Sequence, residues 1–308
     1  MNHATISVIV PIYNSGKYIN KCLDSLLNQT LNSMEIICIN DGSTDNSLKI
    51  IEEYRKKSNK IRIINQSHSG QGVARNKGVS VASGQFIGFV DSDDYVALNF
   101  YEELYIASIK HNVDCVACKA MTVDENNADI QKLSIWGKLP AGIYSQDQIK
   151  QLDWFNTGCS PVLWDKLFKN EIVKKHPSTN LARGQDFVAL IDYTKEIKNI
   201  ELIDKHLYFY RHHNQSVMSY PESINTLSAD LHTEAIATEK IISYYKGYPI
   251  VDFYITEIVK YWSNKMNNIQ LRYFEKQVLL SILNENFRCL EKFYKTHFDL
   301  IKNILTTP

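Results

Sequence analysis

Short apolar runs alternate with amphipathic stretches along the first part of the chain, up to about residue 118. Five runs have the length of a buried strand, and they cover residues 6–10, 35–40, 61–65, 86–90 and 113–118. The helical i, i+3, i+4, i+7, i+8 spacing follows the first run in one apolar set, Ile19, Cys22, Leu23, Leu26 and Leu27. Alternating strands and helices predict crossover units on a mostly parallel sheet.

Turn residues mark the starts of two further helices. A turn at residues 41–45 precedes a helix capped by Thr44 or Asp45, and another helix runs from near Val73 to about Gly84. With strands and helices in this order, the carboxyl ends of the strands bring four polar residues to one rim, Asn14, Asp41, Ser67 and Asp91. In open α/β sheets this rim binds the ligand.

The pattern changes after the fifth run. Residues 119–222 predict loops, a few strands and short helices, whereas the chain beyond them is helical, with Gly247 and Pro249 as its clear breakers. About three helices are expected there. The predicted organisation is one α/β domain over residues 1–222, divided into halves 1–118 and 119–222, and a helical C-terminal region over residues 223–308.

Composition narrows the classes of function. The 308 residues are 44% hydrophobic and carry 34 basic and 34 acidic side chains, so the chain folds around a core and lacks the cationic face of a nucleic-acid binder. No apolar stretch approaches the ~20 residues that span a bilayer, and no secretory signal is recognisable. A cytoplasmic protein without a nucleic-acid partner is expected.

The six cysteines lie in apolar contexts, as is typical of a reducing compartment. Cys115 and Cys118 form a CxxC, but they fall on a predicted strand, where residues three apart point to opposite faces. They are therefore interpreted as structural cysteines rather than as a metal or redox pair.

The fourth apolar run delivers Asp91-Ser92-Asp93-Asp94 at its carboxyl end. Extended backbone places residues 91 and 93 on the same side, so that two carboxylates can reach one cation. Mg²⁺ and Mn²⁺ prefer oxygen ligands and bind through one or two carboxylates plus substrate phosphates. The alternative is an Asp-rich turn that caps the next helix.

Four motifs occur in order along the first half: VIVPIYN at 8–14, INDGSTD at 39–45, GVARNKG at 72–78 and FVDSDD at 89–94. Their order and spacing closely resemble the family 2 glycosyltransferases, which have the GT-A fold. The resemblance is good to about residue 118 and continues more thinly to about residue 220, through WDKLF at 164–168, GQD at 184–186 and YFYR at 208–211. It is closest to bacterial members that build lipopolysaccharide, capsule or other surface glycans.

This resemblance implies a GT-A fold: a Rossmann-like α/β sheet, mixed but mostly parallel and flanked by helices, followed by the helical C-terminal region. Residues 1–118 become the nucleotide-binding half of the domain and residues 119–222 the acceptor-side half. The implied contacts to a nucleotide-diphosphate sugar, commonly a UDP-sugar, are Pro11, Tyr13, Asp41, Arg75, Asp91 and Ser92.

The resemblance also implies a metal site and a catalytic base. Asp93 is the expected ligand of Mn²⁺ or Mg²⁺, and His213, two positions after an arginine, is the expected third ligand. The base is expected in a Glu-Asp pair before a helix; here the pair is Gln185-Asp186, so the role passes to Asp186 and that of the preceding position is open. A carboxylate within hydrogen-bond reach accepts the proton of the attacking hydroxyl.

The predicted activity is transfer of one sugar, with inversion, to a hydroxyl of a glycan or lipid-linked acceptor. A non-catalytic nucleotide- or carbohydrate-binding protein of the same fold is the alternative, supported by Gln185 alone. A dinucleotide-binding oxidoreductase is disfavoured, because Arg75 replaces the last glycine of its fingerprint. An apolar set near the C-terminus predicts contact with a membrane surface, or packing against the parent domain or a partner subunit: Leu290, Phe293, Tyr294, Ile301, Ile304 and Leu305.

Overall fold

The computed structural model describes residues 4–124, 129–131, 139–155, 159–213, 224–268 and 299. Its strands are β1 (Ile6–Ile12), β2 (Met34–Asp41), β3 (Ile61–Gln66), β4 (Phe86–Phe89), β5 (Tyr95–Val96), β6 (Cys115–Val123), β7 (Asp129–Gln131), β8 (Gly142–Ser145), β9 (Lys166–Lys169) and β10 (Asn199–Arg211). They form one sheet in the order β3-β2-β1-β4-β9-β6-β10-β5, with β7 beside β6 and β8 beside β10. β1 to β4 are parallel and β10 is parallel to β6, whereas β9 is antiparallel to both of its neighbours.

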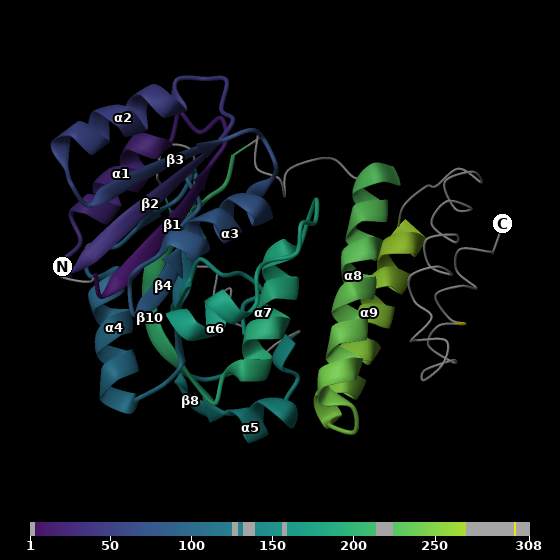
Figure 1. Cartoon of the computed structure of the whole chain (residues 1–308). Coiled ribbons are helices and arrows are strands. Elements are labelled where there is room, and N and C mark those ends of the chain that lie inside the picture. Colours follow the sequence, from purple (N-terminus) through teal and green to yellow (C-terminus); the bar gives the residue numbers. More distant parts are fainter. Residues whose placement is uncertain are drawn as a thin grey trace.

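Helices cover both faces of this sheet (Figure 1). They are α1 (Ile19–Leu27), α2 (Ser47–Lys57), α3 (Gln71–Val81), α4 (Phe100–His111), α5 (Gln146–Lys150), α6 (Asn170–Lys175), α7 (Gln185–Glu196), α8 (Ile224–Tyr245) and α9 (Pro249–Asn268). In β1, Val8 faces the core that contains Leu23 of α1, and Ile9 faces the core that contains Ala74 of α3. This period of two explains why both faces of the strand are apolar.

The predicted strands of the first half are confirmed as β1, β2, β3, β4 and β6, with ends shifted by a few residues. The predicted helical stripe coincides with α1. Helix α2 has Asn46 at its N-cap position in place of Thr44 or Asp45. The Asp45 carboxylate instead accepts hydrogen bonds from the backbone N of Gly16 (2.8 Å) and of Ser47 (2.9 Å), which ties the loop after β1 to the start of α2.

The two cysteines of the CxxC lie on opposite faces of β6, as predicted. Cys115 belongs to one core and Cys118 to the other, and both are fully buried. Burial, the largest effect, raises the pKa of each thiol well above its ordinary value. A buried, protonated thiol packs as a small apolar side chain, which confirms the structural interpretation.

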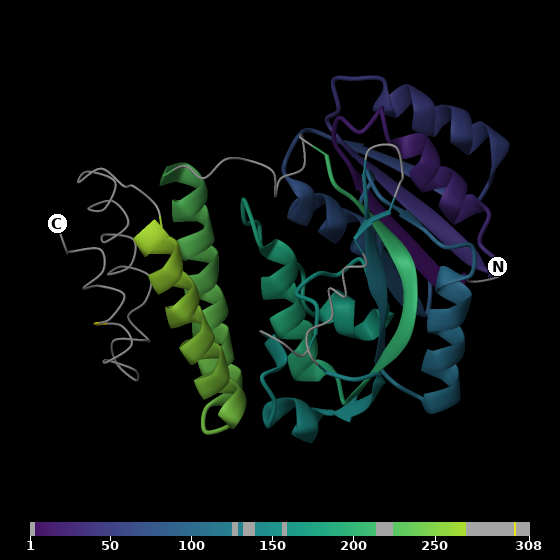
Figure 2. The same ribbon diagram turned by 180° about the vertical axis from the view of Figure 1, so that it is seen from behind.

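The C-terminal helices share a core with the α/β part of the chain. Leu227 and Leu231 of α8 pack in the same cluster as Val188 and Ile191 of α7, and Figure 2 shows α8 and α9 as a layer beyond α7. The predicted break between helices is confirmed at Gly247, which has φ +86°. The apolar set from Leu290 onwards lies outside the described residues, and within the described ones no helix has the length and apolar character to cross a bilayer.

Strand β9 is one of the few strands expected in residues 119–222, but its position was not predicted, because lysines stand at both ends of its four residues. Lys166 is nevertheless fully buried, and its Nζ donates to Asp165 Oδ1 (2.7 Å) and to the carbonyls of Ser160 (2.8 Å) and Val162 (2.7 Å). A buried ammonium is tolerated when all its protons have acceptors. The ion pair therefore fixes the loop that leads from residue 159 into the middle of the sheet.

We expect Lys166→Met to lower the free energy of unfolding by about 3–5 kcal/mol, because Asp165 would remain buried without its partner. Lys169→Met is the matched control: Lys169 is on the same strand and is paired with Asp114, but its side chain is 28% exposed, so about 1 kcal/mol or less is expected. Urea unfolding followed by circular dichroism measures both values. Equal losses in the two variants would contradict this account of Lys166.

Candidate active site

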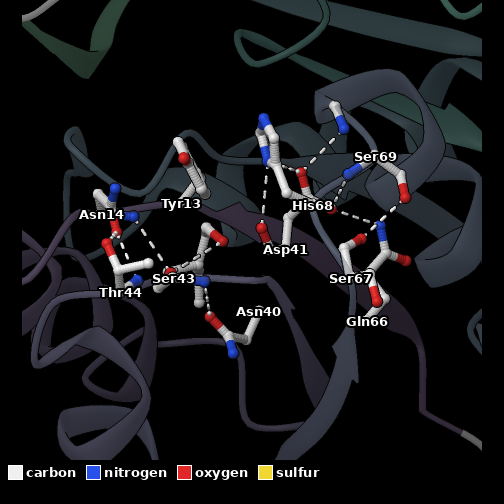
Figure 3. Close-up of polar contacts among 12 residues, drawn as sticks. Tyr13, Asn14, Asn40, Asp41, Ser43, Thr44, Gln66, Ser67, His68 and Ser69 are labelled. Atoms are coloured by element: carbon white, nitrogen blue, oxygen red, sulfur yellow. Dashed lines mark hydrogen bonds and ion pairs between the residues drawn. The ribbon is translucent and has the colours of Figure 1, made fainter.

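The predicted rim is present at the carboxyl edge of β1 to β4. Asn14 follows β1 with φ +51°, a conformation that asparagine tolerates better than most residues. Its backbone N donates to Ser43 Oγ (3.1 Å), and its Oδ1 accepts from the backbone N of Thr44 (2.8 Å). These bonds hold the loop after β1 against the loop after β2 (Figure 3).

Asp41 ends β2 with an almost fully buried carboxylate. Its Oδ1 accepts hydrogen bonds from Gln66 Nε2 (2.7 Å) and from the backbone N of Ser69 (2.9 Å), and its Oδ2 accepts from the backbone N of Gly70 (2.9 Å). Burial alone raises the pKa of Asp41, but these three bonds and the adjacent His68 outweigh it and lower the pKa. The carboxylate is thus held ionised at the centre of the rim.

An aromatic surface lies beside this carboxylate. The ring of His68 stacks on that of Tyr13, with centroids 4.0 Å apart and an interplanar angle of 22°, and His68 Nδ1 lies 2.9 Å from Asp41 Oδ2 (Figure 3). Gly42 makes this approach possible, since it has φ +71° and a Cβ there would lie 2.7 Å from the backbone N of His68. Tyr13 remains 46% exposed, whereas Pro11 is buried in β1. An exposed aromatic ring can stack on a planar heterocycle, and an adjacent carboxylate can accept hydrogen bonds from the N–H groups of that heterocycle.

Arg75 connects the two sides of the site. Its side chain is 1% exposed; Nη2 donates to Asp91 Oδ1 (2.9 Å), and Nη1 donates to Asp186 Oδ1. Asp91 follows β4, whereas Asp186 belongs to the first turn of α7, over 90 residues further along the chain. The predicted donor-side contact and the predicted base are therefore brought together by one guanidinium.

The charges of this group are mutually dependent. Burial lowers the pKa of Arg75, but Asp186 and Asp91 outweigh it and raise that pKa. Burial raises the pKa of Asp91; Arg75 opposes the shift, and the neighbouring carboxylates of Asp186 and Asp93 add to it. Without the guanidinium, both carboxylates would be close to like charges in a poorly solvated place.

The start of α7 is shaped to present Asp186. Gly184, the residue before the helix, has φ +66°, and a Cβ there would lie 2.6 Å from Thr233 Cγ2 of α8. Thr233 Oγ1 donates to the carbonyl of Arg183 (2.8 Å), so α8 supports the loop from behind. The second oxygen of Asp186 accepts from the backbone N of Leu163 at 3.4 Å. The carboxylate is thus fixed on both sides.

Two glutamines form a further link between α3 and α7. Gln71 Nε2 donates to Asp91 Oδ1 (2.8 Å), and Gln185 Nε2 donates to Gln71 Oε1 (2.8 Å). Gln185 is 8% exposed, so this pair is largely shielded from water. The position that departs from the expected Glu-Asp pair is therefore hydrogen-bonded to the first residue of α3.

Asp93 and His213 meet, as the sequence predicts for two ligands of one metal. His213 Nε2 is 2.9 Å from Asp93 Oδ2, and the imidazole is 4% exposed. Adjacent ligands of an octahedral Mg²⁺ or similar ion at about 2.1 Å are separated by about 3 Å, so this spacing fits one cation. Among the described residues no group of three such side chains is gathered, and a cation held by two side chains would keep positions for phosphate oxygens.

The last carboxylate of the motif, Asp94, has a structural part. It accepts hydrogen bonds from the Tyr208 hydroxyl (2.7 Å) and from the backbone N of Arg211 (2.7 Å), and burial raises its pKa well above the ordinary value. These bonds fix the motif against β10, two residues before His213. Ser92 is also buried, and its hydroxyl is hydrogen-bonded to that of Ser15 at 2.6 Å.

Motif positions did not reveal all of these residues. His68 and Gln71 follow β3 in a stretch where neither hydrophobic period nor turn chemistry distinguishes them, and Tyr208 was noted only as part of the segment at 208–211 that resembles the family. One sequence signal was available for His68 and Gln71, because both lie between the assigned positions Asp41 and Arg75. Gln71 also precedes Arg75 by one helical turn, so the two share a face of the helix.

Comparison with known proteins gives the family. The family model described as glycosyl transferase family 2 matches residues 7–171, more than half of the chain. The chain belongs to glycosyl transferase family 2. Its relatives include the uncharacterized glycosyltransferase YibD of Escherichia coli K12, 32% identical over 220 residues, which are 69% of this chain and 62% of YibD. This chain thus spans less than two thirds of that relative's length.

Another relative is the poly(ribitol-phosphate) beta-glucosyltransferase of Bacillus spizizenii, 31% identical over 212 residues, 67% of this chain and 32% of that protein. Among solved structures, S. aureus TarS 1-349 in complex with UDP superposes with a TM-score of 0.74 at 20% identity, covering 98% of this chain and 90% of TarS 1-349. This likeness confirms the GT-A fold and the helical C-terminal region.

We expect Arg75→Met to lower the free energy of unfolding by about 3–5 kcal/mol, because Asp91 and Asp186 would face each other without a counter-charge. The double variant Arg75→Met/Asp186→Asn should recover part of this loss, since one of the two charges is removed. Arg62→Met, at an exposed arginine, is the control and should be nearly neutral. A double variant less stable than Arg75→Met would contradict the electrostatic explanation. Urea unfolding of the four proteins provides the comparison.

Asp41→Asn should lower the free energy of unfolding by about 1–3 kcal/mol near neutral pH, because an amide N–H₂ would oppose one of the three donors. The pKa of Asp41 is lowered in the folded state, so its ionised form stabilises the fold above the ordinary pKa of about 4. The deficit of the variant should therefore shrink as the pH falls below that value. Asp147→Asn, at a side chain that is 92% exposed, is the control. Denaturant unfolding across pH tests this, and a deficit independent of pH would contradict it.

Proposed function

We propose that this chain is an inverting glycosyltransferase that moves a single sugar from a nucleotide-diphosphate sugar to a hydroxyl of a glycan or lipid-linked acceptor. The observation that carries the proposal is the fork of Arg75, which holds Asp186 beside the Asp91–Asp93 turn. A base and a diphosphate site must lie together for a hydroxyl to attack as the nucleotide leaves. The cytoplasmic location and the division into domains at residue 222 stay predictions.

The donor is proposed to be a UDP-sugar. Tyr13 offers a ring for stacking, and Asp41 lies next to it at the carboxyl edge. The support from relatives is that TarS has been crystallised with UDP and, separately, with UDP-GlcNAc. The name of the Bacillus spizizenii relative supports an acceptor among the glycopolymers of the bacterial surface.

Asp186 is proposed to accept the proton of the attacking hydroxyl. Its Oδ1 accepts a hydrogen bond from Arg75, whereas its Oδ2 receives, from the described residues, a long contact of the Leu163 backbone N, so Oδ2 is the oxygen proposed to accept from a hydroxyl. Asp93 and His213 would hold Mn²⁺ or Mg²⁺. When bound, that cation neutralises the charge that develops on the leaving diphosphate. Direct displacement in one step would invert the anomeric carbon.

The proposal predicts metal-dependent turnover with two separable defects. Asp93→Ala should weaken binding of UDP in the presence of Mn²⁺ and lower transfer at least about 100-fold. Asp186→Asn should retain UDP binding but lower transfer by about 10²–10⁴-fold, because it removes the proton acceptor. Calorimetric titration with UDP and Mn²⁺, together with a panel of UDP-sugars and saccharide acceptors, measures binding and turnover.

The same experiment separates this function from binding without catalysis. Asp204→Asn is the control, since Asp204 is exposed and its partner is Lys119. Full transfer by Asp186→Asn would refute the assignment of the base. Nucleotide binding by the unmodified protein without turnover of any donor would instead support a non-catalytic sugar-nucleotide-binding protein, the reading that Gln185 favours.

A further inference from the structure

Gln185 is the end of a hydrogen-bonded chain that begins at a carboxylate. The chain runs from Asp91 Oδ1 to Gln71 Nε2, and from Gln71 Oε1 to Gln185 Nε2, with both distances 2.8 Å. Gln71 is the first residue of α3, and Gln185 is the first residue of α7. The chain therefore crosses from the nucleotide-side helix to the helix that carries Asp186.

The direction of this chain is set by its first member. An ionised carboxylate only accepts hydrogen bonds, so Gln71 must turn its amide N–H₂ towards Asp91. Its carbonyl oxygen then faces Gln185, which must in turn present N–H₂. The amide orientation of both glutamines therefore follows from which groups can donate and which can accept. In this orientation the side-chain carbonyl oxygen of Gln185 takes no part in the hydrogen-bonded chain.

That oxygen is buried without a donor. Within the described residues, Gln185 Oε1 has no hydrogen-bond partner, although the side chain is 92% buried. A buried acceptor of this kind is unusual in folded proteins and points to a group that the isolated chain does not supply. The next residue along the sequence is Asp186, the proposed base, and the hydrogen-bonded chain connects Gln185 through Gln71 to Asp91, a proposed donor contact.

We infer that Gln185 Oε1 accepts a hydrogen bond from a hydroxyl of the sugar carried by the nucleotide donor, and that Gln71 is a positioning residue that orients it. The inference rests on the proposed function. We assign the hydroxyl to the donor sugar rather than to the acceptor, because the chain that orients this oxygen begins at Asp91, a proposed donor contact. A neutral amide is suited to this place, since Gln185→Glu would replace the N–H₂ that Gln71 Oε1 requires with an oxygen.

The test compares binding of UDP with binding of UDP-glucose and of UDP-GlcNAc, each with Mn²⁺, by calorimetric titration. Gln185→Met keeps the length of the side chain but removes both polar groups. It should leave the affinity for UDP within about twofold and lower the affinity for a UDP-sugar about tenfold, as expected for one lost hydrogen bond to a hydroxyl. Gln151→Met, at an exposed glutamine, is the matched control and should change neither affinity.

Two further variants separate the roles within the chain. Gln71→Met removes a donor to Asp91 and also the acceptor that orients Gln185, so it should weaken the binding of UDP and weaken the binding of UDP-sugars further. Gln185→Glu should force Gln71 to reverse its amide and set its oxygen against Asp91, so it should also weaken UDP itself. Thermal unfolding of each variant checks that it is folded at the titration temperature.

Several outcomes would overturn the inference. Equal loss of UDP and UDP-sugar affinity in Gln185→Met would show that Gln185 only supports Asp91. Unchanged donor affinity with a raised KM for the acceptor would show that the hydroxyl belongs to the acceptor. No change in any quantity would show that the oxygen has no ligand. Absence of UDP binding by the unmodified protein is a different result, because it would refute the proposed function itself.

Discussion

The structure of the site depends on the guanidinium of Arg75, because it allows two carboxylates from distant parts of the chain to lie close together away from water. Asp91 is delivered by β4 and Asp186 by α7, and each contacts a different nitrogen of one planar fork. Lysine has a single charged nitrogen and could not bridge the two in this geometry. The ring of Phe89, with its centroid 5.9 Å from the Arg75 Cζ, packs on the same cation and ties it to the strand below.

This constraint explains why the C-terminal helices are needed near the site. Arg75 can hold Asp186 only if α7 begins in the right place, and that start is supported by α8 through the close contact of Gly184 with Thr233. Two ion pairs strengthen the same contact, Arg183–Asp230 at 2.7 Å and Lys240–Asp192 at 2.8 Å. Helices α8 and α9 contribute none of the assigned side chains. They affect the site because α8 fixes the loop before α7 and thereby the position of Asp186.

The sequence predicted the strands and helices that follow from a local pattern of apolar residues. It did not predict elements or contacts that depend on residues far apart in the chain and outside the family motifs. The strands and the first helix were predictable because burial on a sheet imposes a period of two and on a helix a period near 3.6, as Val8, Ile9 and the stripe of α1 show. The position of β9 was not predicted, because a lysine normally indicates an exposed position, whereas Lys166 is buried and its charge is balanced by Asp165. The contacts of Gln71 with Asp91 and with Gln185 were not predictable either, since they join residues 20 and 114 positions apart. The residue assignments drawn from family motifs stay predictions, while their gathering at one rim is observed.

The balance of charge gives a reason for the glutamine at position 185. Asp91 and Asp186 contact one buried arginine, Asp93 and Asp94 follow Asp91 directly in the chain, and the pKa of Asp94 is raised by burial and by its acidic neighbours. The diphosphate of the proposed donor would add further negative charge, so a site of this kind would be helped by a cation and not by another carboxylate. An acid at position 185 would add one next to Asp186, whereas the amide contributes hydrogen bonds without charge. The departure from the Glu-Asp pair is therefore compatible with catalysis, because what the fold requires at this position is a donor to Gln71.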